Sequence, residues 1–124
     1  SLREGEYNYE RFKSYFPNSM TVIGQERISG FALFDLGSHP GIIYTGNNED
    51  SVVFDILEVS EECFNQINLM EIGANYKPIT LAISNKEKII CYEYLGFTSL
   101  RVDNGDWSEY LKSKFVNDEN IITV

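Results

Sequence analysis

The sequence predicts a single domain of mixed α/β (α+β) class, and two kinds of apolar spacing support this prediction. Some segments alternate apolar and polar residues with the period of a strand, and others repeat apolar residues every three or four positions, as amphipathic helices do. The 124 residues are 43% hydrophobic, which suffices for one hydrophobic core and is too little for two domains. We therefore expect one compact domain over residues 1–124.

The strand-like segments occupy the middle of the chain, and they cover residues 21–36, 42–44, 51–59, 79–83 and 89–94. Glycines interrupt the first segment. The segment 51–59 carries apolar and β-branched residues on both faces, as expected for a central strand that is buried on both sides. The last two segments flank a turn at Asn85 and Lys86, so we expect them to form a hairpin.

The helix-like segments cover residues 8–16, 60–73 and 106–115. The first presents an aromatic face and stops at Pro17. In the second, Ser60 is a good N-cap, Glu61 suits the positive end of the helix dipole, and Gly73 ends the apolar period. Asp106 can cap the third, which is expected to be short.

Charge and cysteine content exclude several classes of function. The chain carries 10 basic and 19 acidic residues, a net charge of −9, so we expect no nucleic-acid partner. No apolar stretch reaches membrane-spanning length and no signal-peptide pattern is present, which predicts a cytoplasmic protein without a membrane partner. Cys63, Cys91 and His39 lack metal-binding spacing, so we expect no metal and two reduced, packed cysteines.

Glu71 is the candidate functional residue of the second helix. It lies four residues beyond Ile67 and seven beyond Phe64, so its carboxylate falls on the apolar face of the helix. Burial there would raise its pKa toward the range that suits a general acid/base at neutral pH. The helical wheel equally allows a second interpretation, in which Glu71 lies on the last turn and reaches solvent.

Four short segments, spread over the chain, each contain a recognisable combination of residues. They are Ser1-Leu2-Arg3-Glu4-Gly5 with Asn8, Phe31-Ala32-Leu33-Phe34-Asp35-Leu36-Gly37 with Pro40-Gly41, Ile67-Asn68-Leu69-Met70-Glu71 with Tyr76, and Asn104-Gly105-Asp106-Trp107 with Tyr110. In this order they resemble the signature segments of the gamma-glutamylcyclotransferase-like family, of the gamma-glutamylamine cyclotransferase type. The resemblance spans nearly the whole chain.

This resemblance implies a mixed, partly closed β-barrel with flanking short helices and a pocket for a γ-glutamyl group, without a cofactor. The implied reaction is a transferase or lyase-type cyclisation, in which the α-amine of a γ-glutamyl amine or amino acid attacks its own γ-carbonyl to give 5-oxoproline. Glu71 would be the catalytic acid/base. The turn at Ser1, Leu2 and Arg3 would bind substrate, its backbone N–H groups facing the α-carboxylate, and Tyr76 would line the pocket.

Tyr92 has two interpretations, either lining that pocket or packing within the sheet, and packing is slightly favoured. The sequence also departs from the family pattern. Because it begins at Ser1, we expect the domain to lack the family's first strand at its N-terminus. Asn68 replaces an Asp, Phe54 with Asp55 replaces Gly-Glu, and Pro78 replaces an Arg.

These departures keep two alternatives to catalysis open. One is a non-catalytic module that binds or sequesters a small anion, such as a metabolite or nucleotide, in the same pocket. The other is a structural or interaction domain whose pocket is filled by the ring of Phe54.

Overall fold

The computed structural model describes residues 19–122 together with residues 10 and 14. Within this part of the chain the elements are, in order, β1 (Met20–Ser29), β2 (Phe31–Asp35), β3 (Pro40–Tyr44), β4 (Ser51–Val59), α2 (Glu61–Gly73), β5 (Tyr76–Ala82), β6 (Lys88–Tyr94), β7 (Leu100–Val102) and α3 (Trp107–Ile122). The helix predicted for residues 8–16 and the turn at residues 1–3 lie outside the described residues.

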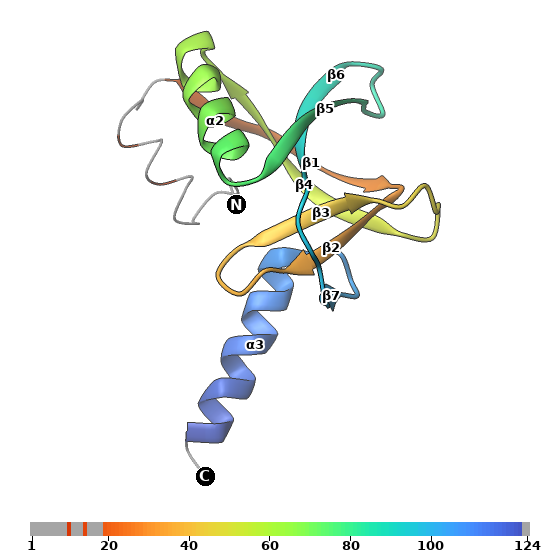
Figure 1. Ribbon diagram of the computed structural model, residues 1–124, viewed down its shortest axis with the longest axis vertical. Helices are drawn as coiled ribbons and strands as arrows, with labels where there is room; N and C mark the ends of the chain where they lie inside the picture. The colour runs from red at the N-terminus through yellow and green to blue at the C-terminus, as the bar shows by residue number, and fades with distance from the viewer. Residues whose placement is uncertain (1–9, 11–13, 15–18, 123–124) are drawn as a thin grey trace.

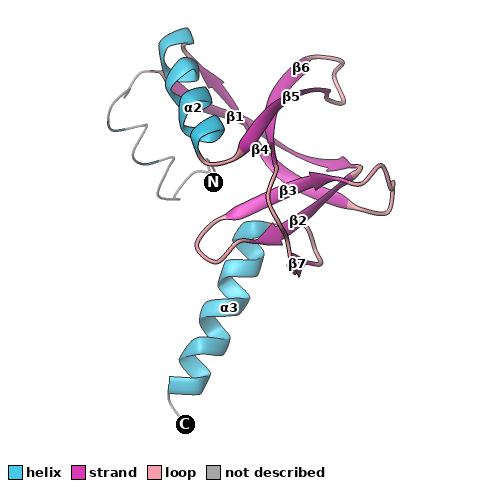
Figure 2. Cartoon of the chain, viewed as in Figure 1, coloured by secondary structure: helices cyan, strands magenta, loops and turns pink. Residues whose placement is uncertain are grey.

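The strands form two sheets (Figures 1 and 2). One is the antiparallel pair of β1 and β4, and the other has the order β5-β6-β3-β2-β7. The β3 and β6 strands run parallel, whereas the other pairs are antiparallel. This arrangement confirms the mixed α+β class. No hydrogen-bonded pairing joins β4 to β6, so the two sheets leave the barrel open on one side.

Gly30 is the corner at which the chain passes from one sheet to the other. Its φ of +93° lies in the left-handed region that glycine tolerates best. Its N–H donates to the Asp50 carbonyl at 2.8 Å, and its own carbonyl accepts from the N–H of Thr45 at 2.8 Å. The predicted segment 21–36 is therefore two strands, β1 and β2, that belong to different sheets.

The β4 strand has the predicted bounds but not the predicted central position. Among the described residues it pairs with β1 alone. Its apolar side chains are explained by two separate clusters: Val52 and Phe54 pack in the cluster of the five-stranded sheet, and Leu57 and Val59 in the cluster beneath α2. The double-sided apolar pattern thus reflects two clusters at successive positions along one strand and does not require flanking strands on both edges.

The second helix and the hairpin form as predicted. The Ser60 hydroxyl accepts a hydrogen bond from the N–H of Cys63 at 3.2 Å, and α2 ends at Gly73. The left-handed residue after this helix is Asn75, with φ 71°, and not the glycine. The hairpin of β5 and β6 turns through Lys86, which also has a positive φ of 67°.

Two apolar clusters form the described core. The larger one contains Phe31, Leu33, Ile42, Val52, Cys91, Val102 and Trp107. The smaller one, between α2 and the paired strands β1 and β4, contains Met20, Cys63 and Ile67. Each cluster holds one of the two cysteines, and both cysteines are free and buried, which confirms the prediction that they pack as small apolar residues.

The third helix is longer than predicted. Asp106 caps it, since its carboxylate accepts from the N–H of Glu109 at 3.3 Å. Trp107, 5% exposed, anchors the first turn in the larger core cluster. From there α3 continues to Ile122 and extends away from both sheets (Figure 1).

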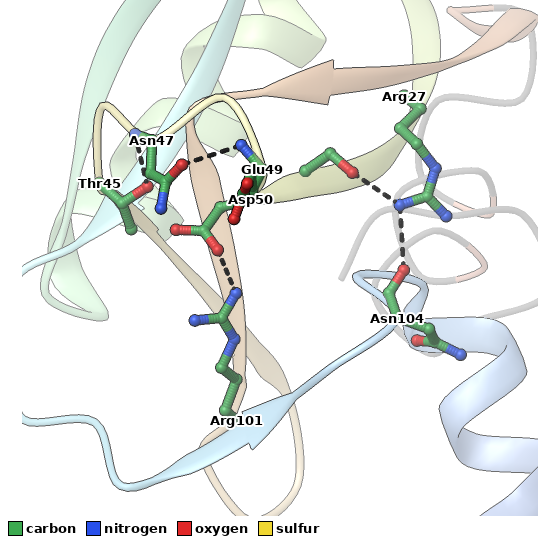
Figure 3. Close-up of polar contacts among 8 residues, drawn as sticks. Arg27, Thr45, Asn47, Glu49, Asp50, Arg101 and Asn104 are labelled. Atoms are coloured by element: carbon green, nitrogen blue, oxygen red, sulfur yellow. Dashed lines mark hydrogen bonds and ion pairs between the residues drawn. The ribbon is translucent and has the colours of Figure 1, made fainter.

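Hydrogen bonds join the turn that precedes α3 to the start of β4 (Figure 3). Nη1 of Arg27 donates to Oγ of Ser51 at 2.9 Å and to the carbonyl of Asn104 at 3.0 Å. The carbonyl of Gly105 accepts from the N–H of Val53 at 2.9 Å. Gly105 has φ +66°, and a Cβ atom there would lie 1.9 Å from the Ser51 carbonyl oxygen, so both the backbone conformation and the available space require glycine.

We expect Gly105→Ala to lower the free energy of unfolding by more than about 2 kcal/mol, because it combines left-handed strain with a backbone clash. Urea unfolding followed by the fluorescence of Trp107 measures this. Gly24→Ala is the matched control, since a Cβ atom at Gly24 meets nothing within 4 Å. Equal stability of the two variants would contradict this explanation of the turn.

Candidate functional site

A pocket of about 720 Å³ lies where the two sheets fail to join. Residues 52–59 of β4 and residues 88–92 of β6 both line it, and α2 contributes Glu61, Phe64, Ile67 and Glu71. Its remaining lining residues are Leu33, Pro40, Ile42, Tyr76 and Trp107. Most of this lining is apolar, so a polar group that faces the pocket is only partly solvated.

Glu71 lies on the last turn of α2, partly buried and facing this pocket. Burial raises the pKa of its carboxyl above the ordinary value. The described residues make no hydrogen bond or ion pair to this carboxylate. The carboxylate therefore lies in the opening between the sheets without a protein donor from this part of the chain.

Tyr76, the second pocket residue that the family resemblance implies, lines the same pocket as Glu71. Its side chain is buried and lines the pocket. The phenol donates a hydrogen bond to the carbonyl oxygen of Pro40 at 2.6 Å, and its ring packs against Tyr94 with centroids 5.2 Å apart. Burial raises the pKa of this phenol, and the nearby charge of Glu71 adds to the effect.

Tyr92 also lines the pocket, in addition to packing against the smaller core cluster. Its phenol donates a hydrogen bond to Oδ1 of Asn68 at 3.2 Å. Burial, together with the charge of Glu71, raises the pKa of Tyr92 to about 12. The sequence slightly favours packing within the sheet for this residue. The only signal for the pocket was that Asn68 lies three positions before Glu71, on the same face of the helix.

The departures from the family pattern have definite positions. The ring of Phe54 packs edge-on against Phe31, with centroids 6.3 Å apart. The cavity beside Glu71 stays open, so the hypothesis of a pocket filled by Phe54 is wrong. Pro78 is exposed on β5 and does not line the pocket. The predicted substrate-binding residues Ser1, Leu2 and Arg3 lie outside the described residues.

The described pocket lining carries more acidic than basic side chains. Its acidic residues are Asp55, Glu58, Glu61 and Glu71, and its basic residue is Lys88. The described residues contain no group of three or more His, Cys, Asp or Glu placed to hold a metal ion. They also contain no helix with the length and hydropathy needed to cross a membrane.

Among the residues whose burial the structure describes, Asp35 is the buried carboxylate, with less exposure than Glu71. Its side chain is 1% exposed, and it accepts hydrogen bonds from the Tyr110 hydroxyl at 2.6 Å, the Gly37 N–H at 2.7 Å and Nζ of Lys114 at 3.3 Å. Burial alone would raise its pKa, but these donors outweigh burial and hold the pKa below its ordinary value. Asp35 thus ties β2 to α3 outside the pocket.

Comparison with known proteins identifies the family. The model of the family described as gamma-glutamyl cyclotransferase, AIG2-like, matches residues 1–109. The chain belongs to this family. The match to the AIG2-like family includes every residue that lines the pocket, from Leu33 to Trp107. A search of curated proteins found no match.

Solved structures share the AIG2-like fold at low sequence identity. PH0828 from Pyrococcus horikoshii is 21% identical with a TM-score of 0.73, and the alignment covers 92% of this chain and 89% of that one. YtfP from Escherichia coli is 17% identical with a TM-score of 0.61, over 83% of this chain and 90% of that one. YkqA from Bacillus subtilis is 24% identical with a TM-score of 0.67, and the alignment covers 91% of this chain but 39% of the YkqA chain.

We expect Tyr110→Phe to lower the free energy of unfolding by about 2 kcal/mol at neutral pH, because it removes a donor from the buried Asp35 carboxylate. The difference from wild type should shrink as pH falls below about 4, since a carboxyl with a lowered folded-state pKa stabilises the fold only while it is ionised. Urea unfolding at several pH values measures this. Tyr44→Phe is the control, because Tyr44 is 62% exposed. A difference that does not vary with pH would contradict this role of Asp35.

We expect Glu71→Gln to be more stable than wild type at neutral pH. A carboxyl whose pKa is raised by folding keeps its proton to a higher pH in the folded state, so wild-type stability falls as pH rises above about 4.3. The variant lacks this loss, and the two proteins should converge below about pH 4. Thermal unfolding across this range is the measurement. Lower stability of the variant at pH 7 would contradict the raised pKa of the Glu71 carboxyl.

Proposed function

We propose that this chain catalyses the intramolecular cyclisation of a γ-glutamyl amine or γ-glutamyl amino acid to 5-oxoproline, with Glu71 as the general acid/base. The observation that carries the proposal is the position of Glu71. It is a partly buried carboxylate with a raised pKa, and it faces a largely apolar pocket in a chain of the AIG2-like gamma-glutamyl cyclotransferase family.

The reaction moves two protons from the α-nitrogen of the substrate to the departing nitrogen. The α-ammonium first loses a proton to Glu71, and the free amine attacks the γ-carbonyl carbon, forming the lactam C–N bond. The bond from that carbon to the γ-amide nitrogen then breaks as the departing nitrogen takes the proton from Glu71. The ring nitrogen gives its second proton to Glu71, which passes it to the released amine. Atoms and protons balance without water, and the products are 5-oxoproline and a protonated amine or amino acid.

A single carboxylate suits this sequence of steps. An ordinary glutamate is too weak a base to hold a proton near neutral pH. Burial raises the pKa of Glu71 and so makes its carboxylate a stronger base. Because ring closure joins two atoms of one molecule, a pocket that folds the substrate supplies much of the rate enhancement by positioning. No covalent intermediate on the protein is needed.

The substrate's α-carboxylate needs its own donors. We assign these to the backbone N–H groups of the turn at Ser1, Leu2 and Arg3, which the family resemblance implies, and Tyr76 to the pocket wall. Lys88 is the basic side chain of the described lining.

A non-catalytic module for a small anion is the second candidate, and the replacements at Asn68 and Phe54 near Glu71 favour it. The charge of the pocket counts against it. Four acidic side chains and one basic side chain line the described pocket, and such a lining disfavours a nucleotide or another multiply charged anion.

We expect Glu71→Gln to lower kcat/KM for a γ-glutamyl amine by about 100-fold or more, because the amide cannot accept the α-ammonium proton. Release of 5-oxoproline from a panel of γ-glutamyl amines and amino acids, measured by mass spectrometry, tests this. Glu62→Gln is the matched control, since Glu62 lies on the same helix, is exposed and does not line the pocket.

The pH profile gives a second measurement of the same role. The rising limb of kcat/KM should have an apparent pKa above the ordinary glutamate value of about 4.3. Equal product formation by wild type and Glu71→Gln would exclude the proposed catalysis. A metabolite bound stoichiometrically and recovered unchanged would instead support the binding module.

A further inference from the structure

The acidic and the apolar residues of the pocket lining lie toward different ends of β4. At the start of this strand Val52 and Phe54 pack in the larger core cluster, and at its end Leu57 and Val59 pack beneath α2. Three of the four acidic residues in the described lining belong to α2 or to the end of β4 beside it, namely Glu58, Glu61 and Glu71. Carboxylates are therefore concentrated at the α2 end of the pocket.

The described lining at the other end is apolar. It consists of the pocket residues that belong to the larger core cluster or pack against it: Leu33, Ile42, Val52, Phe54, Cys91 and Trp107. None of these side chains is charged at neutral pH, since burial raises the pKa of the Cys91 thiol to about 12. A charged ligand group at this wall would lose water without meeting a counter-charge from it, whereas an apolar group gains from leaving water. The wall therefore favours an apolar part of a ligand.

Phe54 gives this wall a surface that the family pattern lacks, because that pattern has glycine at this position. Its ring packs edge-on against Phe31, with centroids 6.3 Å apart and an interplanar angle of 85°. Phe31 is fully buried, whereas Phe54 is only partly buried and lines the pocket. Part of the Phe54 side chain is thus available to a ligand.

Trp107 is held in the same wall by contacts on both sides. Its ring packs against Tyr110 with centroids 5.3 Å apart, and the Tyr110 hydroxyl donates to the buried Asp35. The turn before it is joined to β4 by the bond from the Val53 N–H to the Gly105 carbonyl. An indole fixed in this way presents a preformed surface, so a ligand that packs on it does not have to order it.

We propose that Phe54 and Trp107 form the subsite for the departing group of the substrate, and that this subsite selects an apolar amine. The inference rests on the proposed function, in which Glu71 acts on the γ-glutamyl group at the α2 end. The group beyond the γ-amide nitrogen then extends toward the larger core cluster. The substrate class is the γ-glutamyl derivatives of apolar amines, and derivatives of diamines are disfavoured because their departing group carries a charge to an uncharged wall.

The test compares two probes that differ in one charged group. They are the glutaryl amides of pentylamine and of 1,5-diaminopentane, and the second carries a terminal ammonium where the first ends in a methyl group. A glutaryl group is a γ-glutamyl group without its α-amine, so neither probe can cyclise and binding is measured apart from turnover. Dissociation constants are measured by NMR titration of the full chain at neutral pH. Trp107 is the single tryptophan of the chain, so its indole N–H signal reports contact at the wall directly.

We expect wild type to bind the pentyl amide at least about tenfold more tightly than the aminopentyl amide, and the pentyl amide to shift the Trp107 indole signal. Phe54→Ala should reduce this preference by at least about threefold, and Phe54→Leu should keep most of it, because leucine restores an apolar side chain. Phe97→Ala is the matched control, since Phe97 is fully exposed and does not line the pocket. It should leave the preference unchanged.

The inference is overturned if the aminopentyl amide binds as tightly as the pentyl amide or more tightly, which would mean that the acidic lining decides selectivity. It is also overturned if folded Phe54→Ala keeps the full preference, or if saturating pentyl amide leaves the Trp107 indole signal in place. Circular dichroism establishes that the variants are folded, and the indole signal of wild type decides the matter if Phe54→Ala does not fold.

The two proposals fail separately. Release of 5-oxoproline at equal rates from γ-glutamyl-pentylamine and from the γ-glutamyl derivative of 1,5-diaminopentane leaves catalysis and removes the selective subsite. A preference for the pentyl amide that depends on Phe54, without release of 5-oxoproline from either γ-glutamyl compound, leaves the apolar subsite and removes catalysis.

Discussion

The missing pairing between β4 and β6 is the constraint on which the site depends. The chain turns out of one sheet and into the other at Gly30, whose positive φ and paired backbone groups fix the corner. The β4 strand is thereby held by β1, while β6 is held by β5 and, at one register position, by β3. The space between them is the pocket, and α2 places Glu71 in its wall.

Two carboxylates in this fold show how surroundings decide a role. Asp35 is almost completely buried and has three donors, so its pKa is lowered and it serves to hold α3 on β2. Glu71 is less buried, has no donor among the described residues, and its pKa is raised. A satisfied carboxylate stabilises a fold, whereas an unsatisfied one retains the capacity to exchange a proton with a ligand.

The sequence was most informative where structure is set by neighbouring residues. The bounds of β4 and the cap and end of α2 follow from local patterns. The central position predicted for β4 was wrong, because apolar residues on both faces do not specify what covers each face. Local patterns also could not predict two side-chain hydrogen bonds between distant residues. Tyr110 donates to Asp35 across 75 positions of sequence, and Tyr92 donates to Asn68 across 24.

Phe54 and Asn68 depart from the family pattern, and the contacts of both side chains show why the fold accepts them. Phe54 does not fill the cavity, because Phe31 offers its ring a partner in the core. Asn68 does not remain unpaired, because Tyr92 donates to it. Each replacement side chain thus has one partner in the fold, and the pocket stays open. What the two replacements change is the ring that Phe54 adds to the pocket wall and the hydrogen bond that Asn68 accepts beside it.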